Sequence, residues 1–412
     1  MIDFELSPEI DGMRQMIHAL AESSMRPIAR EYDEREHEEP TEWHAMMWTV
    51  SRGSTVFGGE KSEKKSAEKK GEKPSERFLA SSVTIEELSW GDAGLYLSIP
   101  NAGLGGAAVA AAGTPEQRKR FLARFSEGEP KWAAMAITEP GCGSDSAAIT
   151  TTAVRDGDEW VLNGTKIFCT SGERAVAKSE GFVVVWATVG KATGRAGIKA
   201  FVVEHHTPGM TVTKVEDKLG IRASDTATIV FEDCRIPLDN LLGSAEVKAQ
   251  SSEGFKGVMA TFDATRPAVA ASALGIGRAA VDFVRDALTR AGIVIRYDTP
   301  PNKLTALERD FMDMEANLQA ARLLTWRASW MMDRGMHNNL EASMSKAKAG
   351  LAVTLVTQKA VELLGPLGYS RTLLLEKWMR DAKINDIFEG TQQINLMIVA
   401  RRILDYSSKE LN

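Results

Sequence analysis

The chain has 412 residues, of which 43% are hydrophobic and 26% charged, a composition typical of a water-soluble globular protein with about two to three domains. Its formal net charge of -6 excludes the basic field that a nucleic-acid-binding protein needs, so we expect no nucleic acid as a partner. The three cysteines, Cys142, Cys169 and Cys234, match no zinc or redox spacing, so we expect no metal and a reducing compartment, by default the cytoplasm.

Helical periodicity dominates residues 1–131, which we predict to form an N-terminal helical domain. Ser7-Pro8-Glu9 is a typical helix start, because Pro is favoured at the first helical position. A charged insert at about 51–75 interrupts the pattern with interleaved Lys and Glu. We expect a solvated loop or a short exposed helix there, with an interaction role as the alternative. The small apolar run at 102–113 is too short to span a membrane, and the acidic N-terminus indicates neither a signal nor a transit peptide.

The pattern changes near Lys131, and residues 132–245 are predicted to form a central antiparallel β domain. Short runs that favour strands alternate with turn signals such as Asn163-Gly164, a spacing typical of a compact sheet or barrel. These runs are 133–137, 150–154, 159–162, 182–185, 200–203 and 228–231. Residues 246–412 return to long amphipathic runs and are predicted to form a C-terminal helical bundle. The fold class is therefore α+β, in the order helices, sheet, helices.

Glu389 is the single acid between Ile387 and Ala400, and Gly390 beside it breaks the helical pattern. A carboxylate at such a break, flanked by Ile387 and Phe388, would be partly desolvated. Desolvation raises the pKa of a carboxyl group toward the value that a general base needs. The alternative is a solvated Glu at a helix end, which is where isolated acids usually lie.

Two loops of the predicted β domain are candidate ligand sites. Residues 138–145, TEPGCGSD, follow a strand and would present backbone N–H groups and hydroxyls to an anion or to a polar ring edge. The alternative for this loop is an ordinary polar turn. Residues 163–172, NGTKIFCTSG, contain Phe168, which would lie against a flat cofactor or belong to the core.

The two loops and the Glu389 stretch together resemble the acyl-CoA dehydrogenases, flavoproteins that introduce a 2,3-double bond into acyl-CoA thioesters. AITEPGCGSD at 136–145 resembles the first signature of that family, and RDAKINDIFEGTQQI at 380–394 resembles the second. WVLNGTKIFCTSG, SDTATIVFEDCRIP and GFKGVMATFDATRPAVAASALG match further segments between them, in the expected order. The resemblance covers nearly the whole chain, and it implies the fold of helices, sheet and helices expected above.

The resemblance also implies a reaction, a cofactor and partners. Glu389 would remove the α proton of the thioester, while N5 of the flavin of FAD takes the β hydrogen as hydride. An electron-transfer flavoprotein would accept the electrons, and the chain would form a homo-oligomer. Two alternatives on the same fold are an acyl-CoA oxidase or monooxygenase that uses oxygen, and a subunit of a heteromeric acyl-CoA dehydrogenase complex.

Site residues follow from the resemblance by position in this sequence. Phe168 stands where the family commonly has Trp, which keeps an aromatic face toward the flavin. The residues implied at FAD are Thr138, Ser144, Phe168, Thr170, Arg290, Thr391 and Gln393. The residues implied at the substrate are Ser144, Asp263, Arg266 and Gly390.

Three segments depart from the family pattern. An Arg-x-x-Phe-Gly motif that reaches the FAD of the neighbouring subunit is here 290–294, RAGIV. A second such element, Gln-x-x-Gly-Gly-x-Gly, is here 362–368, where Glu362 is repulsive to a pyrophosphate and Pro366 supplies no N–H donor. The third is the Lys/Glu insert, which replaces a Gly-Gly loop near the substrate channel. A mixed oligomer with a second kind of subunit therefore competes with a homotetramer or homodimer that has altered FAD contacts.

Overall fold

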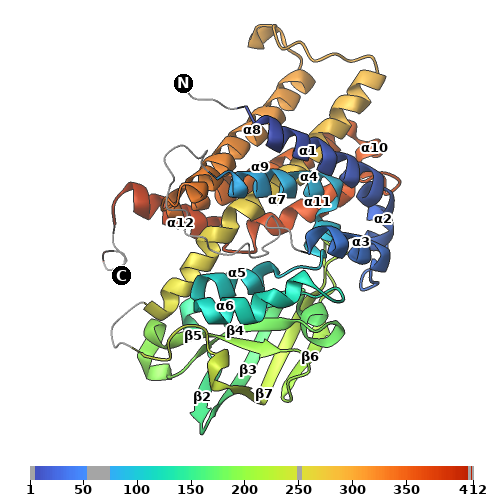
Figure 1. The fold of residues 1–412 in the computed structure, drawn as a ribbon. Coiled ribbons are helices and arrows are strands. Elements are labelled where there is room, and N and C mark those ends of the chain that lie inside the picture. The colour runs from blue at the N-terminus through green and yellow to red at the C-terminus, as the bar shows by residue number, and fades with distance from the viewer. Residues whose placement is uncertain (1–4, 53–74, 248–252, 407–409, 411–412) are drawn as a thin grey trace.

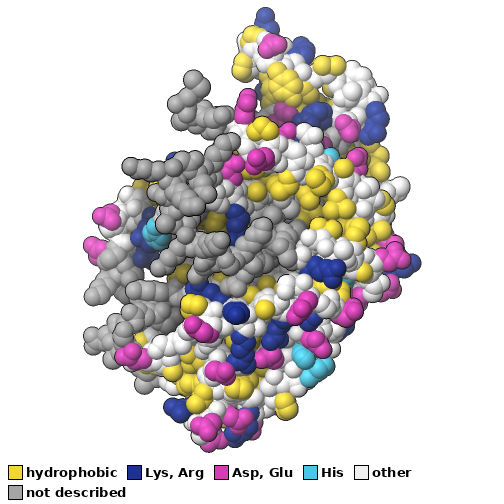
Figure 2. Space-filling view, viewed as in Figure 1, with side chains coloured by type: hydrophobic (Ala, Val, Ile, Leu, Met, Phe, Trp, Pro, Cys, Tyr) yellow, Lys and Arg dark blue, Asp and Glu magenta, His cyan; other side chains and the backbone are white. Residues whose placement is uncertain are grey.

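The computed structural model describes residues 5–52, 75–247, 253–406 and 410. Helices form both ends of the chain, and a curled sheet lies between them in sequence and at one end of the molecule (Figure 1). Most of the charged insert at 51–75 lies outside the described residues. On the face shown in Figure 2, hydrophobic side chains gather over the helical half, and side chains of both charges are interspersed over the half that carries the sheet.

Two of the N-terminal helices, α1 and α6, begin where the sequence supplies a start signal. Pro8 opens α1, and the Thr114 hydroxyl and the Gln117 side chain form a capping box at the start of α6. The helices are α1 (Pro8–Leu20), α2 (Ala29–Glu34), α3 (Thr41–Ser51), α4 (Arg77–Leu97), α5 (Gly103–Ala112) and α6 (Pro115–Leu122).

The sheet has seven strands in the order β1-β4-β2-β3-β7-β6, with β5 beside β4. The strands are β1 (Ala133–Ala136), β2 (Thr152–Asp156), β3 (Glu159–Thr170), β4 (Phe182–Thr188), β5 (Ile198–Glu204), β6 (Met210–Val215) and β7 (Thr226–Pro237). Every residue of β4 is buried, because Val183 and Val185 face the core inside the curled sheet while Phe182 and Val184 face the core beneath the helices. A continuous apolar run such as 182–187 is what burial on both faces requires.

The prediction of an antiparallel sheet is wrong at two pairings. β1 pairs with β4 in parallel, Ala133 opposite Phe182, and β2 meets β4 in parallel where Thr152 lies opposite Thr188. The β2–β3 hairpin and the segment at 171–181 intervene, so the chain comes back to the starting end of β1 before β4 begins. β6 was not among the predicted strands; it is an edge strand whose side chains are all exposed or half-buried, so its pattern lacks a clear apolar face.

The C-terminal region is a bundle built around α7, which packs on α4, α8 and α9. Its helices are α7 (Glu253–Arg290), α8 (Ala306–Asp333), α9 (Asn339–Leu364), α10 (Pro366–Tyr369), α11 (Leu375–Ala382) and α12 (Gln392–Ile403). Among the described helices, the stretch Gly257–Arg290 is long and apolar enough to cross a membrane. Most of the apolar part of this helix is buried within the bundle, as is typical of the core helix of a globular protein.

A buried ion triad joins all three parts of the chain. Lys377 of α11 lies between Asp92 of α4 and Asp381, whose Oδ2 is 2.6 Å from the ammonium. The other oxygen of Asp381 accepts the backbone N–H of Ile221 at 2.6 Å, in the loop between β6 and β7. The N-terminal helices, the sheet and the bundle therefore share one fully buried charge cluster.

Candidate active site

Glu389 lies in a tight turn between two helical segments, as the sequence pattern predicted. The 3-10 helix η9 (Lys383–Asp386) ends just before the turn, and Thr391 caps α12 by accepting the N–H of Ile394 at 3.2 Å. Glu389 and Gly390 both have positive φ, 52° and 90°. A non-glycine residue in this region stores backbone strain, and such strain clusters at functional sites. Gly390 fits because a Cβ there would lie 3.2 Å from the side-chain nitrogen of Asn395 in an already strained conformation.

Glu389 is half-buried, and groups from three helices surround its carboxylate. Thr265 of α7 donates its hydroxyl to Oε2 at 2.5 Å, and the charges of Lys346 on α9 and Arg266 on α7 act on the carboxylate. Burial raises the pKa of the Tyr96 phenol on α4, and Glu389 lies near enough to raise it further. Burial raises the pKa of Glu389, and the Thr265 hydrogen bond and the two cations oppose that rise. The environment is the one that a general base needs, and it disfavours the solvated alternative.

Arg266 and Asp263, predicted at the substrate, lie on the turn of α7 beside Thr265. Arg266 is only 2% exposed, and its Nη1 donates to Asp263 Oδ1 at 2.8 Å and to the Ser343 hydroxyl at 3.3 Å. Asn339 donates to the same Asp263 oxygen at 2.8 Å. The ion pair thus fixes the Arg266 guanidinium next to Gly390 and balances its charge within the protein.

Three neighbours of Glu389 were missed by the sequence analysis: Thr265, Lys346 and Tyr96. Thr265 adjoins Arg266, but nothing in the sequence indicates that its hydroxyl reaches a residue 124 positions away. Lys346 and Lys348 stand among small residues in SMSKAKAG, and a lysine in such a helical segment was the one signal that could have found Lys346. Tyr96 gave no signal.

The two glycine-rich loops of the sheet lie side by side. The Ile167 N–H donates to the Thr138 carbonyl at 2.9 Å, and a buried ion pair of 2.7 Å between Lys166 and Glu139 holds the loops together. Burial alone would raise the pKa of Glu139, but the Lys166 ammonium and donated hydrogen bonds hold it at about 2. The carboxylate therefore stays ionised and keeps the 138–145 loop in place at neutral pH.

These loops fit a flat ring with a polar edge, which is the form of the FAD isoalloxazine. Phe168 is 60% exposed at a positive φ of 56° beside a β-bulge, so its ring stands out from the sheet. An aromatic ring on a strained backbone gains stability when a planar group covers it. Ser144 is exposed, Thr138 and Thr170 are half-buried, and a Cβ added at Gly141 would meet nothing within 4 Å. The residues present therefore fit the cofactor.

The remaining residues predicted at FAD lie elsewhere. Thr391 and Gln393 sit at the start of α12, directly after the Glu389 turn, where Thr391 is half-buried and Gln393 exposed. Arg290 is the last residue of α7, which runs from the sheet to the opposite end of the molecule (Figure 1). The structure therefore does not bring Arg290 together with the two loops of its own chain.

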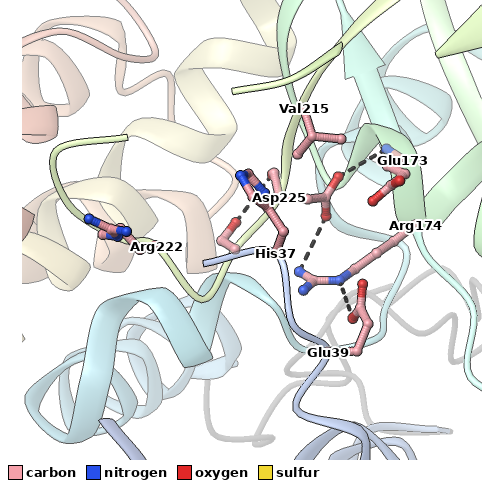
Figure 3. A pocket seen from close by; sticks show the side chains of 8 residues that line it. His37, Glu39, Glu173, Arg174, Val215, Arg222 and Asp225 are labelled. Atoms are coloured by element: carbon pink, nitrogen blue, oxygen red, sulfur yellow. Dashed lines mark hydrogen bonds and ion pairs between the residues drawn. The ribbon is translucent and has the colours of Figure 1, made fainter. Parts of the chain in front are cut away.

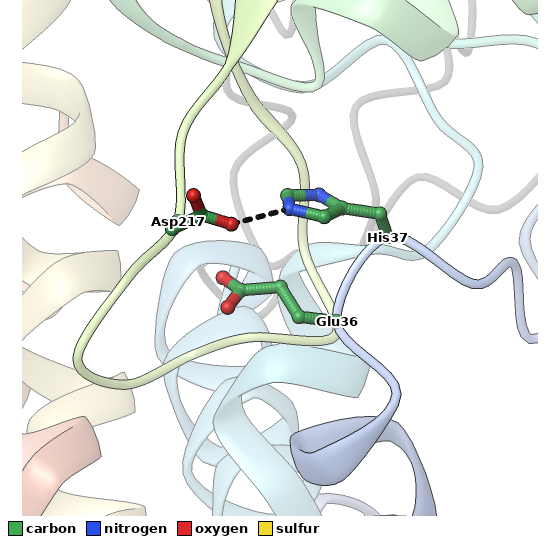
Figure 4. Close-up of side chains that lie close together, drawn as sticks. All are labelled: Glu36, His37 and Asp217. Carbon is green, nitrogen blue, oxygen red and sulfur yellow. Dashed lines mark hydrogen bonds and ion pairs between the residues drawn. The ribbon is translucent and has the colours of Figure 1, made fainter.

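A separate polar pocket lies between the 36–39 loop, the start of η5 (Arg174–Lys178) and the end of the β6–β7 loop (Figure 3). Arg174 lines it and pairs with Glu39 at 2.8 Å and Asp225 at 3.2 Å. The nearby side chains of Glu36, His37 and Asp217 could hold a metal by distance alone (Figure 4). Within the described chain, however, Lys218 and Arg222 pair with Glu36, and His37 bonds Asp217 at 2.9 Å. These charges are therefore satisfied by one another as a salt-bridge cluster between chain segments.

Family models match most of the chain in three parts. The N-terminal domain of acyl-CoA dehydrogenase matches residues 7–129, its middle domain 134–234 and its C-terminal domain 252–404. The chain belongs to the acyl-CoA dehydrogenase family. The matched ranges fall inside the regions predicted as 1–131, 132–245 and 246–412, whose exact boundaries stay a prediction.

Named relatives agree with this assignment. The mitochondrial short-chain specific acyl-CoA dehydrogenase of Rattus norvegicus is 37% identical over 403 residues, which are 97% of this chain and 91% of the relative. The butyryl-CoA dehydrogenase structure from Megasphaera elsdenii superposes with a TM-score of 0.81 at 31% identity, covering 98% of this chain and 100% of that one. A chain from the electron transferring flavoprotein structure of Acidaminococcus fermentans gives 0.82 at 31% identity, covering 98% and 100%. This acyl-CoA dehydrogenase is an FAD-dependent enzyme that acts on acyl-CoA.

Proposed function

We propose that Glu389 is the base that removes the α proton of a short-chain acyl-CoA thioester. The observation that carries this proposal is the Glu389 turn, where a desolvated carboxylate with a raised pKa is held by Thr265 at 2.5 Å. A thioester α proton is only weakly acidic, so the base must be strengthened by desolvation. The negative charge that develops on the thioester oxygen also needs positioned donors. Among the described residues the backbone N–H of Glu389 has no hydrogen-bond partner, so it is free to serve as one.

FAD, when bound, supplies the acceptor for the β hydrogen of the substrate as hydride. In our proposal the hydroxyls of Thr138, Ser144 and Thr170 hold the polar edge of its ring, and Phe168 lies against its face. Thr391 and Gln393 contact the cofactor from the start of α12.

The named relatives indicate the length of the acyl chain in the substrate. They include a short-chain specific and a butyryl-CoA enzyme, so we propose a short, unbranched acyl group. The Asp263–Arg266 pair and Gly390 line the turn that would receive the thioester end. The half-buried Tyr96 would bound the acyl side, because it approaches Glu389 from α4.

Anaerobic titration of the purified holoenzyme with acyl-CoAs of increasing length tests this assignment. Butyryl-CoA is expected to bleach the flavin absorbance near stoichiometrically, and long-chain or branched acyl-CoAs are expected to bleach it weakly. Bleaching by long chains alone would contradict the short-chain assignment and keep the reaction. No bleaching by any acyl-CoA would contradict the dehydrogenase itself. Hydrogen peroxide formed during turnover in air would favour the oxidase alternative over electron transfer to an electron-transfer flavoprotein.

The chain is also proposed to work as an oligomer of its own copies. Large apolar side chains are exposed along α12 and α9, namely Leu396 and Met397 at 50% and 57% and Leu355 at 49%. α12 packs against α9, so these side chains belong to neighbouring elements, and burial against a second copy would remove them from water. The mixed-oligomer alternative rests on the altered 290–294 and 362–368 segments, where Val294 is 74% exposed. The cysteines in the described chain are unpaired, which favours the reducing cytoplasm as the compartment.

FAD content after purification of this chain alone separates the two kinds of oligomer. If a homotetramer or homodimer completes the cofactor site, we expect close to one tightly bound FAD per chain by absorbance, with light scattering showing the oligomer. A flavin-poor chain that gains FAD and activity only with a second kind of subunit would contradict the homo-oligomer. The matched control is the same measurement after incubation with excess FAD, which detects simple loss of cofactor during purification.

A further inference from the structure

Lys346 is a buried cation beside the proposed base, and the reaction described above does not use it. It lies on α9 and is only 1% exposed. Its ammonium donates to the Gly390 carbonyl at 2.6 Å, and within the described chain it makes no ion pair. Burying an unpaired ammonium is costly, so a lysine here needs a compensating role.

The first consequence of this hydrogen bond is geometric. The Gly390 carbonyl accepts from Lys346 and also from the side-chain nitrogen of Asn395 at 2.9 Å. Two donors from α9 and α12 thus clamp the peptide that joins Gly390 to Thr391, one residue after Glu389. Successive residues with positive φ persist only when their surroundings over-determine them, and this clamp does so for Glu389 and Gly390.

The second consequence is electrostatic. Around Glu389, α7 contributes the Arg266 guanidinium, which Asp263 balances at 2.8 Å, and α4 contributes the neutral phenol of Tyr96. Among the described charges around Glu389, the ammonium of Lys346 is therefore the one that no ion pair neutralises. Besides Glu389, the half-buried Asp386 of η9 also acts on this ammonium. Burial lowers the pKa of Lys346 to about 8, so the ammonium is charged at neutral pH. A positive charge favours the carboxylate form of Glu389 and counteracts the effect of desolvation.

We propose that Lys346 is a positioning residue for Glu389: it clamps the Gly390 carbonyl, and its charge favours the carboxylate form of Glu389 over the protonated form. This inference rests on the proposed role of Glu389 as the base. Lys346 acts through Glu389 and touches neither substrate nor cofactor in this scheme.

The test is the pH profile of flavin bleaching by butyryl-CoA in three variants of the holoenzyme. Lys346→Met removes the charge and the donor, Lys346→Gln keeps a donor without the charge, and Lys346→Arg keeps the charge. Without the ammonium the pKa of Glu389 rises, so the acid limb of the profile is expected to move to higher pH by about one unit or more in Met and Gln. In Lys346→Arg the acid limb is expected to stay near that of the wild type. If Lys346→Met does not fold, Lys346→Gln carries the test.

Lys348→Met is the matched control, because Lys348 lies on the same helix and its ammonium donates to Asn317 at 2.6 Å instead. Melting temperature and FAD content are measured alongside, since a purely structural role would lower both and leave the acid limb in place. Acid limbs of Lys346→Met and Lys346→Gln that superimpose on the wild type, with Glu389→Gln inactive, would overturn this inference alone. A Glu389→Gln variant as fast as the wild type would overturn the proposed function and this inference with it.

Discussion

Glu389→Gln is expected to abolish flavin reduction by acyl-CoA while FAD stays bound. Glutamine has the size of glutamate and can still accept the Thr265 hydroxyl, so the turn should keep its shape, but an amide cannot take a proton from carbon. Removing a positioned general base costs on the order of 10²–10⁴-fold in rate. Single-turnover bleaching under anaerobic conditions measures the rate, and flavin absorbance after gel filtration measures the bound cofactor.

The same variant is expected to be at least as stable as the wild type at neutral pH. Burial raises the pKa of Glu389, so the folded state binds this proton more tightly than the unfolded state does. The free energy of unfolding therefore falls as the pH rises from the pKa of this group in the unfolded state through its pKa in the folded state. Glutamine does not ionise, so the variant avoids this loss of stability. A melting temperature well below that of the wild type would show that the carboxylate stabilises the turn, contrary to this account.

Glu315→Gln is the matched control for activity. Glu315 lies on α8 and pairs with Arg285 at 2.7 Å, away from the turn. It is expected to bleach at the wild-type rate. A Glu389→Gln variant that turns over normally would remove Glu389 from the mechanism and point to another base.

Lys377→Met is expected to cause the largest loss of stability. Lys377 is 1% exposed between Asp92 and Asp381, both also buried, so the substitution leaves two carboxylates facing each other without a cation. Although burial alone would lower the pKa of Lys377, these two acids raise it, and the ammonium stays charged in the folded state. Breaking a buried ion network by removing one partner costs about 3–5 kcal/mol. Urea unfolding, followed by far-UV circular dichroism, measures the change in the free energy of unfolding.

Two comparisons make that measurement decisive. Lys214→Met on β6 removes a lysine that is 59% exposed and pairs with Glu216, and it is expected to cost only about 0–1 kcal/mol. Adding Asp92→Asn to Lys377→Met should recover part of the loss, because it removes one of the two unpaired charges while an oxygen remains to accept the Leu95 N–H. Equal losses from Lys377→Met and Lys214→Met, or a further loss in the double variant, would contradict the role of the buried triad.

Sequence alone determined the features that depend on neighbours along the chain. Helical periodicity, the apolar run of β4 and the turn signals predicted the order of helices, sheet and helices, because each reflects spacing within a few residues. The helix break at Glu389-Gly390 was predictable for the same reason, since Gly390 marks it locally. Short motifs likewise predicted the two glycine-rich loops as ligand sites, because the glycines and hydroxyls are adjacent along the chain.

Tertiary structure decided what surrounds these features. Whether Glu389 is solvated depended on α4, α7 and α9, whose Tyr96, Thr265 and Lys346 meet it from distant parts of the chain. The parallel pairing of β1 with β4 likewise depends on where the intervening chain returns. Desolvation, ion pairing and strand partners all arise from contacts between residues remote in sequence. The residues next to either partner therefore do not indicate which distant residue it will contact. The sequence predicted the position of Glu389 at the helix break, but its burial and its pKa depend on the three helices around it.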